Sequence, residues 1–115
     1  MTDNVEELTM IYDRLIENIQ DFSMSADKQI EKLRGFAIAD EIASDFSDIT
    51  LKYAKELFEN NWITSDQYGL FLNIDRELEG MNGYKELWNE DSLKYSAEWE
   101  KCRLMGRELL KSLGY

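Results

Sequence analysis

A chain of 115 residues can bury one hydrophobic core but is too short for two independent ones. Hydrophobic residues make up 43% of the chain and aromatic residues 12%, which excludes the composition of a disordered protein. A formal net charge of -11 disfavours direct binding to DNA, RNA or an anionic membrane, because like charges repel over roughly 8 to 10 Å at physiological salt.

The first half of the chain predicts three helices, since it contains no proline and few glycines to interrupt them. The first is expected to begin at a Thr2 or Asp3 cap. Its apolar residues recur at steps of three and four: Val5, Leu8, Tyr12, Leu15, Ile19 and Phe22. Ser25 is suited to cap a short second helix. A third helix should run from about residue 40 to the Asn60-Asn61 pair, with these residues inward: Ile42, Phe46, Ile49, Tyr53 and Leu57. Whether the second and third helices are continuous stays open.

The next elements are marked by capping and turn residues. Thr64, three residues before Gln67, matches a capping box and predicts a fourth helix that ends near Gly80. Glycine and asparagine at residues 80–83 then predict a turn. Asn89 or Asp91 can cap a short helix after this turn.

The last helix is predicted to run from a Ser96 cap to a stop at Gly114. Its inward residues are Trp99, Cys102, Gly106, Leu109, Leu110 and Leu113. Because Cys102 lies on this stripe, we interpret it as core packing, the alternative being a reactive thiol. The whole pattern predicts an all-α fold in which residues 1–115 form a single-domain helical bundle of about five to six helices.

The residue types argue against catalysis. The sequence contains no histidine, which is the usual general base near neutral pH and the commonest metal ligand, and it has no glycine-rich phosphate loop. We therefore expect no enzymatic activity, no metal and no cofactor. The acidic amino terminus, the single cysteine and the lack of an apolar run of about 20 residues lead us to expect a cytoplasmic protein without a membrane segment.

An acidic stretch in the third helix is the best candidate for a partner-binding surface. Between Arg34 and Lys52 no basic residue occurs, and the acidic residues are Asp40, Glu41, Asp45 and Asp48. The last three are expected on one helical face beside the apolar stripe, where they repel one another. The stretch is either a solvated face or a docking surface for cationic groups of a protein partner, which would offset the repulsion.

Two further residues suggest a structural ion pair. Asp75 lies beside Phe71 and Leu78 at the edge of an apolar face, and a buried charge needs a partner. Arg103 flanks the apolar stripe of the last helix in a similar way, so the two are candidates to pair, with exposed or partner-facing roles as the alternative. Three aromatic residues in or beside the connections serve either as satellite core or as binding anchors: Trp62, Tyr84 and Trp88.

A set of residues in the second half of the chain carries a family resemblance: Asp40 to Phe46, Leu72 to Asp75, Leu87-Trp88, Asp91 to Leu93, Ser96, Glu98-Trp99, Arg103, Gly106 and Leu109-Leu110. Over roughly residues 36–115 the chain resembles small bacterial immunity proteins that accompany secreted polymorphic toxins, including those of contact-dependent growth inhibition systems. The resemblance implies a cytoplasmic protein that covers the active site of a toxin domain delivered by sibling cells. The toxin is usually a nuclease, and we expect one toxin per immunity protein.

The charge leads independently to the same hypothesis, because nuclease clefts are basic where they hold phosphates and an acidic surface can occupy them. We therefore expect an immunity protein that binds a cognate basic toxin domain, such as an RNase. A DNA-mimicking or regulatory adaptor for a housekeeping nucleic-acid protein is the main alternative. A carboxylate-dependent enzyme is a third class, and it would require a concave site with convergent aspartates and glutamates.

Overall fold

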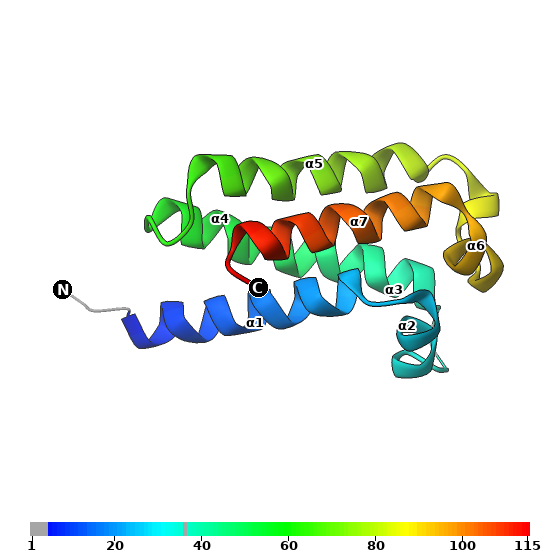
Figure 1. The fold of residues 1–115 in the computed structure, drawn as a ribbon, viewed down its shortest axis with the longest axis horizontal. Coiled ribbons are helices and arrows are strands. Elements are labelled where there is room, and N and C mark those ends of the chain that lie inside the picture. Colours follow the sequence, from blue (N-terminus) through cyan, green and yellow to red (C-terminus); the bar gives the residue numbers. More distant parts are fainter. Residues whose placement is uncertain (1–4, 36) are drawn as a thin grey trace.

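The structure is a computed structural model, and it describes residues 5–35 and 37–115. Its elements are α1 (Val5–Ser23), α2 (Ala26–Lys32), α3 (Ile38–Ser44), the π-helical turn η1 (Asp45–Thr50), α4 (Leu51–Glu59), α5 (Ser65–Met81), the 3-10 turn η2 (Lys85–Leu87), α6 (Glu90–Tyr95) and α7 (Ala97–Ser112) (Figure 1). Since α3, η1 and α4 follow one another without a break, we call them together the α3–α4 helix. Counted in this way, the described residues form six helices and no strand, which confirms the predicted all-α bundle.

The body of the bundle is formed by the long helices α1, α5 and α7 and by the α3–α4 helix (Figure 1). Helix α1 packs against α7 and the α3–α4 helix, and α5 packs against the same two helices. The short helices α2 and α6 contact each other at one end of the bundle. The largest fully buried side chains come from all four long helices and from α6: Trp99, Phe46, Phe71, Leu15, Ile19, Leu57, Ile74, Leu93 and Leu109.

Four of the predicted helix starts are confirmed by side-chain caps, whereas the third helix begins at Ile38, slightly earlier than predicted, with no side-chain cap at Ala37. Ser25 accepts a hydrogen bond from the backbone N–H of Lys28 at 3.3 Å. Thr64 and Gln67 form the reciprocal capping box at the start of α5. The side chains of Asn89 and Ser96 cap α6 and α7 by accepting from the backbone N–H groups of Ser92 and Trp99, which decides between the two candidate caps of α6. The Thr2 or Asp3 cap lies outside the described residues.

Helices α2 and α3 are separate, which answers the question that the sequence left open. Gly35 in the connection has φ 95°, a conformation that residues with a Cβ rarely adopt. Helix α4 ends as predicted at the asparagine pair, where Asn61 has φ 63°.

The π-helical turn η1 changes which residues face the core. The sequence predicts Ile49 inward, and this prediction is wrong: Ile49 is 41% exposed, whereas Thr50 is 1% exposed. The backbone N–H of Leu51 donates to the carbonyl of Phe46, five residues earlier. Because a π turn contains more residues than an α turn, each residue advances by a smaller angle, and the inward position after Phe46 falls to Thr50.

Candidate partner-binding surface

The four acidic residues of the predicted surface lie on the α3–η1 part of the α3–α4 helix, but they do not form one stripe; Glu41 lines neither of the two hollows described next and only adds to the negative field at Asp45. Asp45 faces α1 and α2, where it lines a pocket with Asn18 and Asp21. Asp40 and Asp48 line a hollow on the other flank, beside α5. The expected single stripe is therefore divided, since the smaller angular advance in η1 turns Asp48 away from Asp45 and toward α5.

The hollow beside α5 collects more carboxylates than the sequence predicted. We call it the acidic groove; it is lined by Asp40, Ala43, Ser44, Ser47, Asp48, Asp75, Leu78, Glu79, Asn82 and Trp88. Four of these ten residues are acidic and none is basic. None of the four carboxylates forms an ion pair with another residue in the described part of the chain. The groove thus presents negative charge that the fold itself does not neutralise.

Serine hydroxyls orient two of these carboxylates. Ser47 Oγ donates to Asp75 Oδ1 at 2.8 Å, and Ser44 Oγ donates to Asp48 Oδ2 at 3.0 Å. Asp75 is half-buried, and the Ser47 hydroxyl partly compensates for its lost hydration without cancelling its charge. The sequence places Asp75 at the edge of an apolar face but gives no sign of Ser47, which comes from a distant segment.

Of the three aromatic residues in or beside the connections, Trp88 belongs to the core edge and to the groove. Its indole N–H donates to the carbonyl of Met81 at 2.9 Å, and its ring meets Trp99 edge to face at 5.4 Å. Trp62 packs against Tyr12 with ring centroids 6.1 Å apart yet stays 37% exposed, and Tyr84 is 57% exposed. Of these three aromatic residues, only Trp88 lines the acidic groove.

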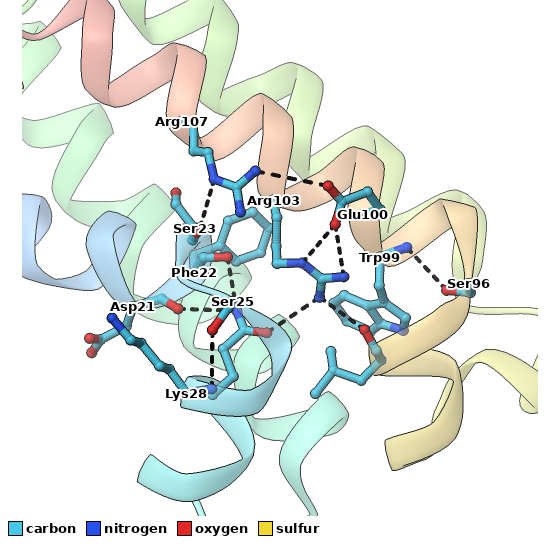
Figure 2. Close-up of polar contacts among 12 residues, drawn as sticks. Asp21, Phe22, Ser23, Ser25, Lys28, Ser96, Trp99, Glu100, Arg103 and Arg107 are labelled. Atoms are coloured by element: carbon cyan, nitrogen blue, oxygen red, sulfur yellow. Dashed lines mark hydrogen bonds and ion pairs between the residues drawn. The ribbon is translucent and has the colours of Figure 1, made fainter.

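The predicted ion pair between Asp75 and Arg103 is wrong. Arg103 belongs to a different polar network, which Figure 2 shows and which does not include Asp75. In this network its guanidinium is 3.2 Å from Glu100 Oε1. Arg103 Nη1 also donates to the carbonyl of Leu93 at 3.0 Å and to Gln29 Oε1 at 3.5 Å. Glu100 precedes Arg103 by three residues on the same helix, so it satisfies the charge locally, and α7 directs the guanidinium toward α2 and α6.

Gln29 is the polar residue that the sequence analysis missed. It is 3% exposed, and its Nε2 donates to the carbonyls of Asp21 and Phe22 at 3.1 and 2.9 Å. Arg107 Nε donates to the next carbonyl, that of Ser23, at 3.2 Å. These donors satisfy carbonyls at the end of α1, which have no partner within the helix. A single glutamine in a short helix carries no sequence signal of this role.

The pocket that contains Asp45 lies between α1, α2 and the α3–α4 helix, and we call it the α1–α2–α3 pocket. Its lining residues are Asn18, Asp21, Phe22, Met24, Gln29, Lys32, Leu33, Ile42, Asp45 and Phe46. Burial raises the pKa of the Asp45 carboxyl, and Glu41, Asp21 and Asp48 add to the rise because their charges repel its anion. Lys32 Nζ binds both carboxylate oxygens of Asp21 at 2.7 Å.

Cys102 is 1% exposed and its thiol donates to the sulfur of Met81 at 3.7 Å, which confirms the core interpretation. Burial raises the pKa of the Cys102 thiol to about 12; Glu77 adds to this rise, whereas Arg103 and Lys101 oppose it. The thiol is therefore protonated throughout the neutral range.

We expect iodoacetamide at pH 8 to alkylate Cys102 at least roughly a hundredfold more slowly in the folded protein than in the chain unfolded by guanidinium chloride, because only the thiolate reacts. Mass spectrometry of timed samples measures the two rates. Comparable rates would mean that Cys102 is accessible in the folded state, contrary to its burial.

The described residues contain no group of three or more histidine, cysteine, aspartate or glutamate side chains that could hold a metal ion. Within the same residues, no helix is both long enough and apolar enough to cross a lipid bilayer. Comparisons of the chain with protein-family models, with curated proteins and with solved structures found no match.

Proposed function

We propose that this protein is an immunity protein that binds a cognate basic toxin domain in the cytoplasm and neutralises it by covering its active-site cleft. The toxin would be a nuclease, such as an RNase. The observation that carries the proposal is the acidic groove, where Asp40, Asp48, Asp75 and Glu79 meet without a basic neighbour. Neutralisation by occlusion needs no catalytic residue and no cofactor in the inhibitor.

The chemistry of the proposed partner matches the groove. A nuclease cleft gathers lysine and arginine side chains because it must hold phosphates, and its positive field attracts the carboxylates of the groove. Opposite potentials accelerate encounter and fix orientation, so association should slow as salt is added. Leu78 and Trp88 line the same groove and offer apolar surface for the stems of the partner's cationic side chains. The resemblance of residues 36–115 to bacterial immunity proteins supports the same proposal.

Co-expression with the product of the adjacent upstream gene tests the proposal. We expect that product to be toxic alone, to be harmless in the presence of this chain, and to co-purify with it. An upstream product that is neither toxic nor bound would contradict the proposal. Capture of a housekeeping nucleic-acid protein instead would favour a DNA-mimicking or regulatory adaptor.

A carboxylate-dependent enzyme has one observation in its favour, because the groove is concave and brings acidic side chains together. The enzyme would turn over a small molecule without a protein partner, and replacing Asp48 with asparagine would abolish that turnover. Assays of the isolated chain against chromogenic glycosides address this candidate. Substrate hydrolysis that is lost in Asp48→Asn would replace the neutralisation proposal.

Reversing two groove charges, in the double variant Asp40→Lys and Asp48→Lys, should weaken binding of the toxin by more than about tenfold, since two attractive contacts become repulsive. Both residues are exposed, so the fold should survive. Biolayer interferometry at several salt concentrations measures the loss.

The matched control is the double variant Glu59→Lys and Glu108→Lys, which changes the net charge by the same amount at exposed positions that do not line the groove. We expect this control to bind within about threefold of the unmodified chain, through the weaker long-range field alone. Equal losses in the two double variants would place the interface elsewhere.

A further inference from the structure

The α1–α2–α3 pocket is distinct from the acidic groove and lies on the opposite flank of the α3–α4 helix. Its apolar wall is formed by Phe22, Met24, Leu33, Ile42 and Phe46. The rings of Phe22 and Phe46 lie 4.9 Å apart, and both are buried. Within this wall Phe22, Ile42 and Phe46 are buried, whereas Met24 and Leu33 are partly exposed, as are the polar side chains of Asn18, Asp21 and Asp45. The pocket is therefore apolar in its depth and acidic at its mouth.

The size of the cavity restricts what can enter it. Its volume is about 50 Å³, whereas a cavity that holds benzene measures about 150 Å³. An aromatic ring is therefore too large, and a narrow aliphatic chain fits. One lining residue, Gln29, is held in place by hydrogen bonds to two α1 carbonyls and to Arg103, so this side of the pocket is ordered before a ligand binds. Figure 2 shows the labelled members of this network, Asp21, Phe22 and Arg103.

The mouth of the pocket already attracts a cation. Lys32 Nζ lies 2.7 Å from Asp21 Oδ2, although both side chains remain substantially exposed, at 55% and 41%. Asp45 has no ion-pair partner among the described residues, and its carboxylate is repelled by Glu41, Asp21 and Asp48. The Asp21 carboxylate is thus paired with a lysine of the same chain, whereas the Asp45 carboxylate can receive a cation from outside.

We infer that the α1–α2–α3 pocket is a docking site for the side chain of an arginine or lysine of the protein partner, with Lys32 as an internal competitor. The aliphatic stem would lie against Leu33 and Ile42, and the cationic head would meet Asp45 and Asp21. Charge complementarity selects this occupant, because a neutral aliphatic chain would leave Asp45 uncompensated. The inference rests on the proposed function, in which the partner is a basic protein.

The pocket can be tested without the toxin, by titrating the isotope-labelled full chain with n-butylguanidinium chloride and following backbone amide signals by NMR. We expect saturable shifts at Asn18, Leu33 and Asp45 with a dissociation constant in the millimolar range, ordinary for so small a ligand. Guanidinium chloride and 1-butanol are the matched probes, since each carries only one half of the ligand. Equal affinity for 1-butanol, or no saturable shift at the pocket, would overturn the inference.

Two variants sharpen the result. Lys32→Met removes the competitor and should tighten binding of n-butylguanidinium by about threefold or more, whereas Asp45→Asn should weaken it by a similar factor. Lys55→Met is the matched control, because it makes the same charge change at an exposed position of α4 outside the pocket, and we expect less than twofold effect. Equal tightening in the two lysine variants would attribute the effect to net charge and contradict an internal competitor.

The outcome is separable from that of the proposed function. Binding of n-butylguanidinium depends only on this chain, whereas neutralisation depends on the toxin. If the toxin binds through the groove but n-butylguanidinium does not bind in the pocket, only the inferred docking site is contradicted. A probe bound in the pocket with no toxin captured would contradict the proposed function alone.

Discussion

Replacing Arg103 with methionine should lower the free energy of unfolding by about 2 to 4 kcal/mol. Methionine keeps the apolar stem but donates no hydrogen bond, so the carbonyl of Leu93 and the amide oxygen of Gln29 lose a donor at a 3%-exposed site. Each buried acceptor left unpaired costs about 1 to 3 kcal/mol. Chemical denaturation followed by tryptophan fluorescence measures the change, and Trp99 packs close to the network as a probe (Figure 2).

Glu100→Gln is the control for this prediction. Glu100 accepts from the same guanidinium, but its side chain is 52% exposed, so water replaces the lost charge interaction. We expect this variant to cost less than about 1 kcal/mol. Should Arg103→Met prove as mild as Glu100→Gln, the guanidinium would contribute no more than a surface ion pair.

Gly106→Ala should destabilise the fold by about 1 to 3 kcal/mol, the usual cost of overpacking a core. Helices α1 and α7 approach so closely at this glycine that an added Cβ would overlap Ser23 Oγ and lie 3.1 Å from Phe22 Cδ2. The Ser23 hydroxyl is itself held by the carbonyl of Ile19 at 2.7 Å, which limits its freedom to move aside. Thermal unfolding followed by circular dichroism measures the loss.

The same substitution at Gly69 should have the opposite sign. Gly69 lies inside α5, and an added Cβ there meets no atom within 4 Å. Alanine is a better helix former than glycine by about 1 kcal/mol, so Gly69→Ala should stabilise the protein by up to that amount.

Adding Ser23→Ala to Gly106→Ala should restore part of the stability that Gly106→Ala loses, because it removes the overlapping hydroxyl. Strictly additive effects of the two substitutions would exclude a direct clash.

The helix starts could be predicted because each depends on a local pattern. A side-chain oxygen at Ser25, Thr64, Asn89 or Ser96 reaches an N–H only three residues ahead, so the nearby sequence is sufficient. The sequence alone does not decide whether α2 and α3 are separate, since Gly35 can either bend a helix or end it.

The π turn could not be predicted, because the choice between Ile49 and Thr50 as the inward residue depends on tertiary packing. Helical periodicity favours Ile49, whereas in the fold Thr50 takes the inner position and its hydroxyl donates to the carbonyl of Asp45 at 3.2 Å. The same turn divides the acidic stripe, so the sequence indicates Asp40 and Asp48 as members of an acidic surface but not their grouping with Asp75 and Glu79 in the groove.

The partners of Arg103 were predictable only in part. Glu100 lies three residues before it, a spacing that brings side chains together on a helix and that could have revealed the pair. Gln29 and the carbonyl of Leu93 come from other elements and reach Arg103 only after the bundle is assembled. Asp75 and Arg103 both lie beside an apolar stripe in the sequence, yet Asp75 accepts a hydrogen bond from Ser47 and Arg103 pairs with Glu100.

Under the proposed function, the π turn would also set what shape the toxin domain must have. Asp48 belongs to a hollow beside α5, whereas Asp45, three residues earlier, belongs to a pocket beside α1 and α2. Because the two sites lie on different flanks of the α3–α4 helix, a flat basic patch of the proposed toxin would engage only one of them. A toxin domain that engages both sites would need a positively charged segment on each side of the α3–α4 helix. The distance between these two segments would then distinguish the toxin from equally basic proteins.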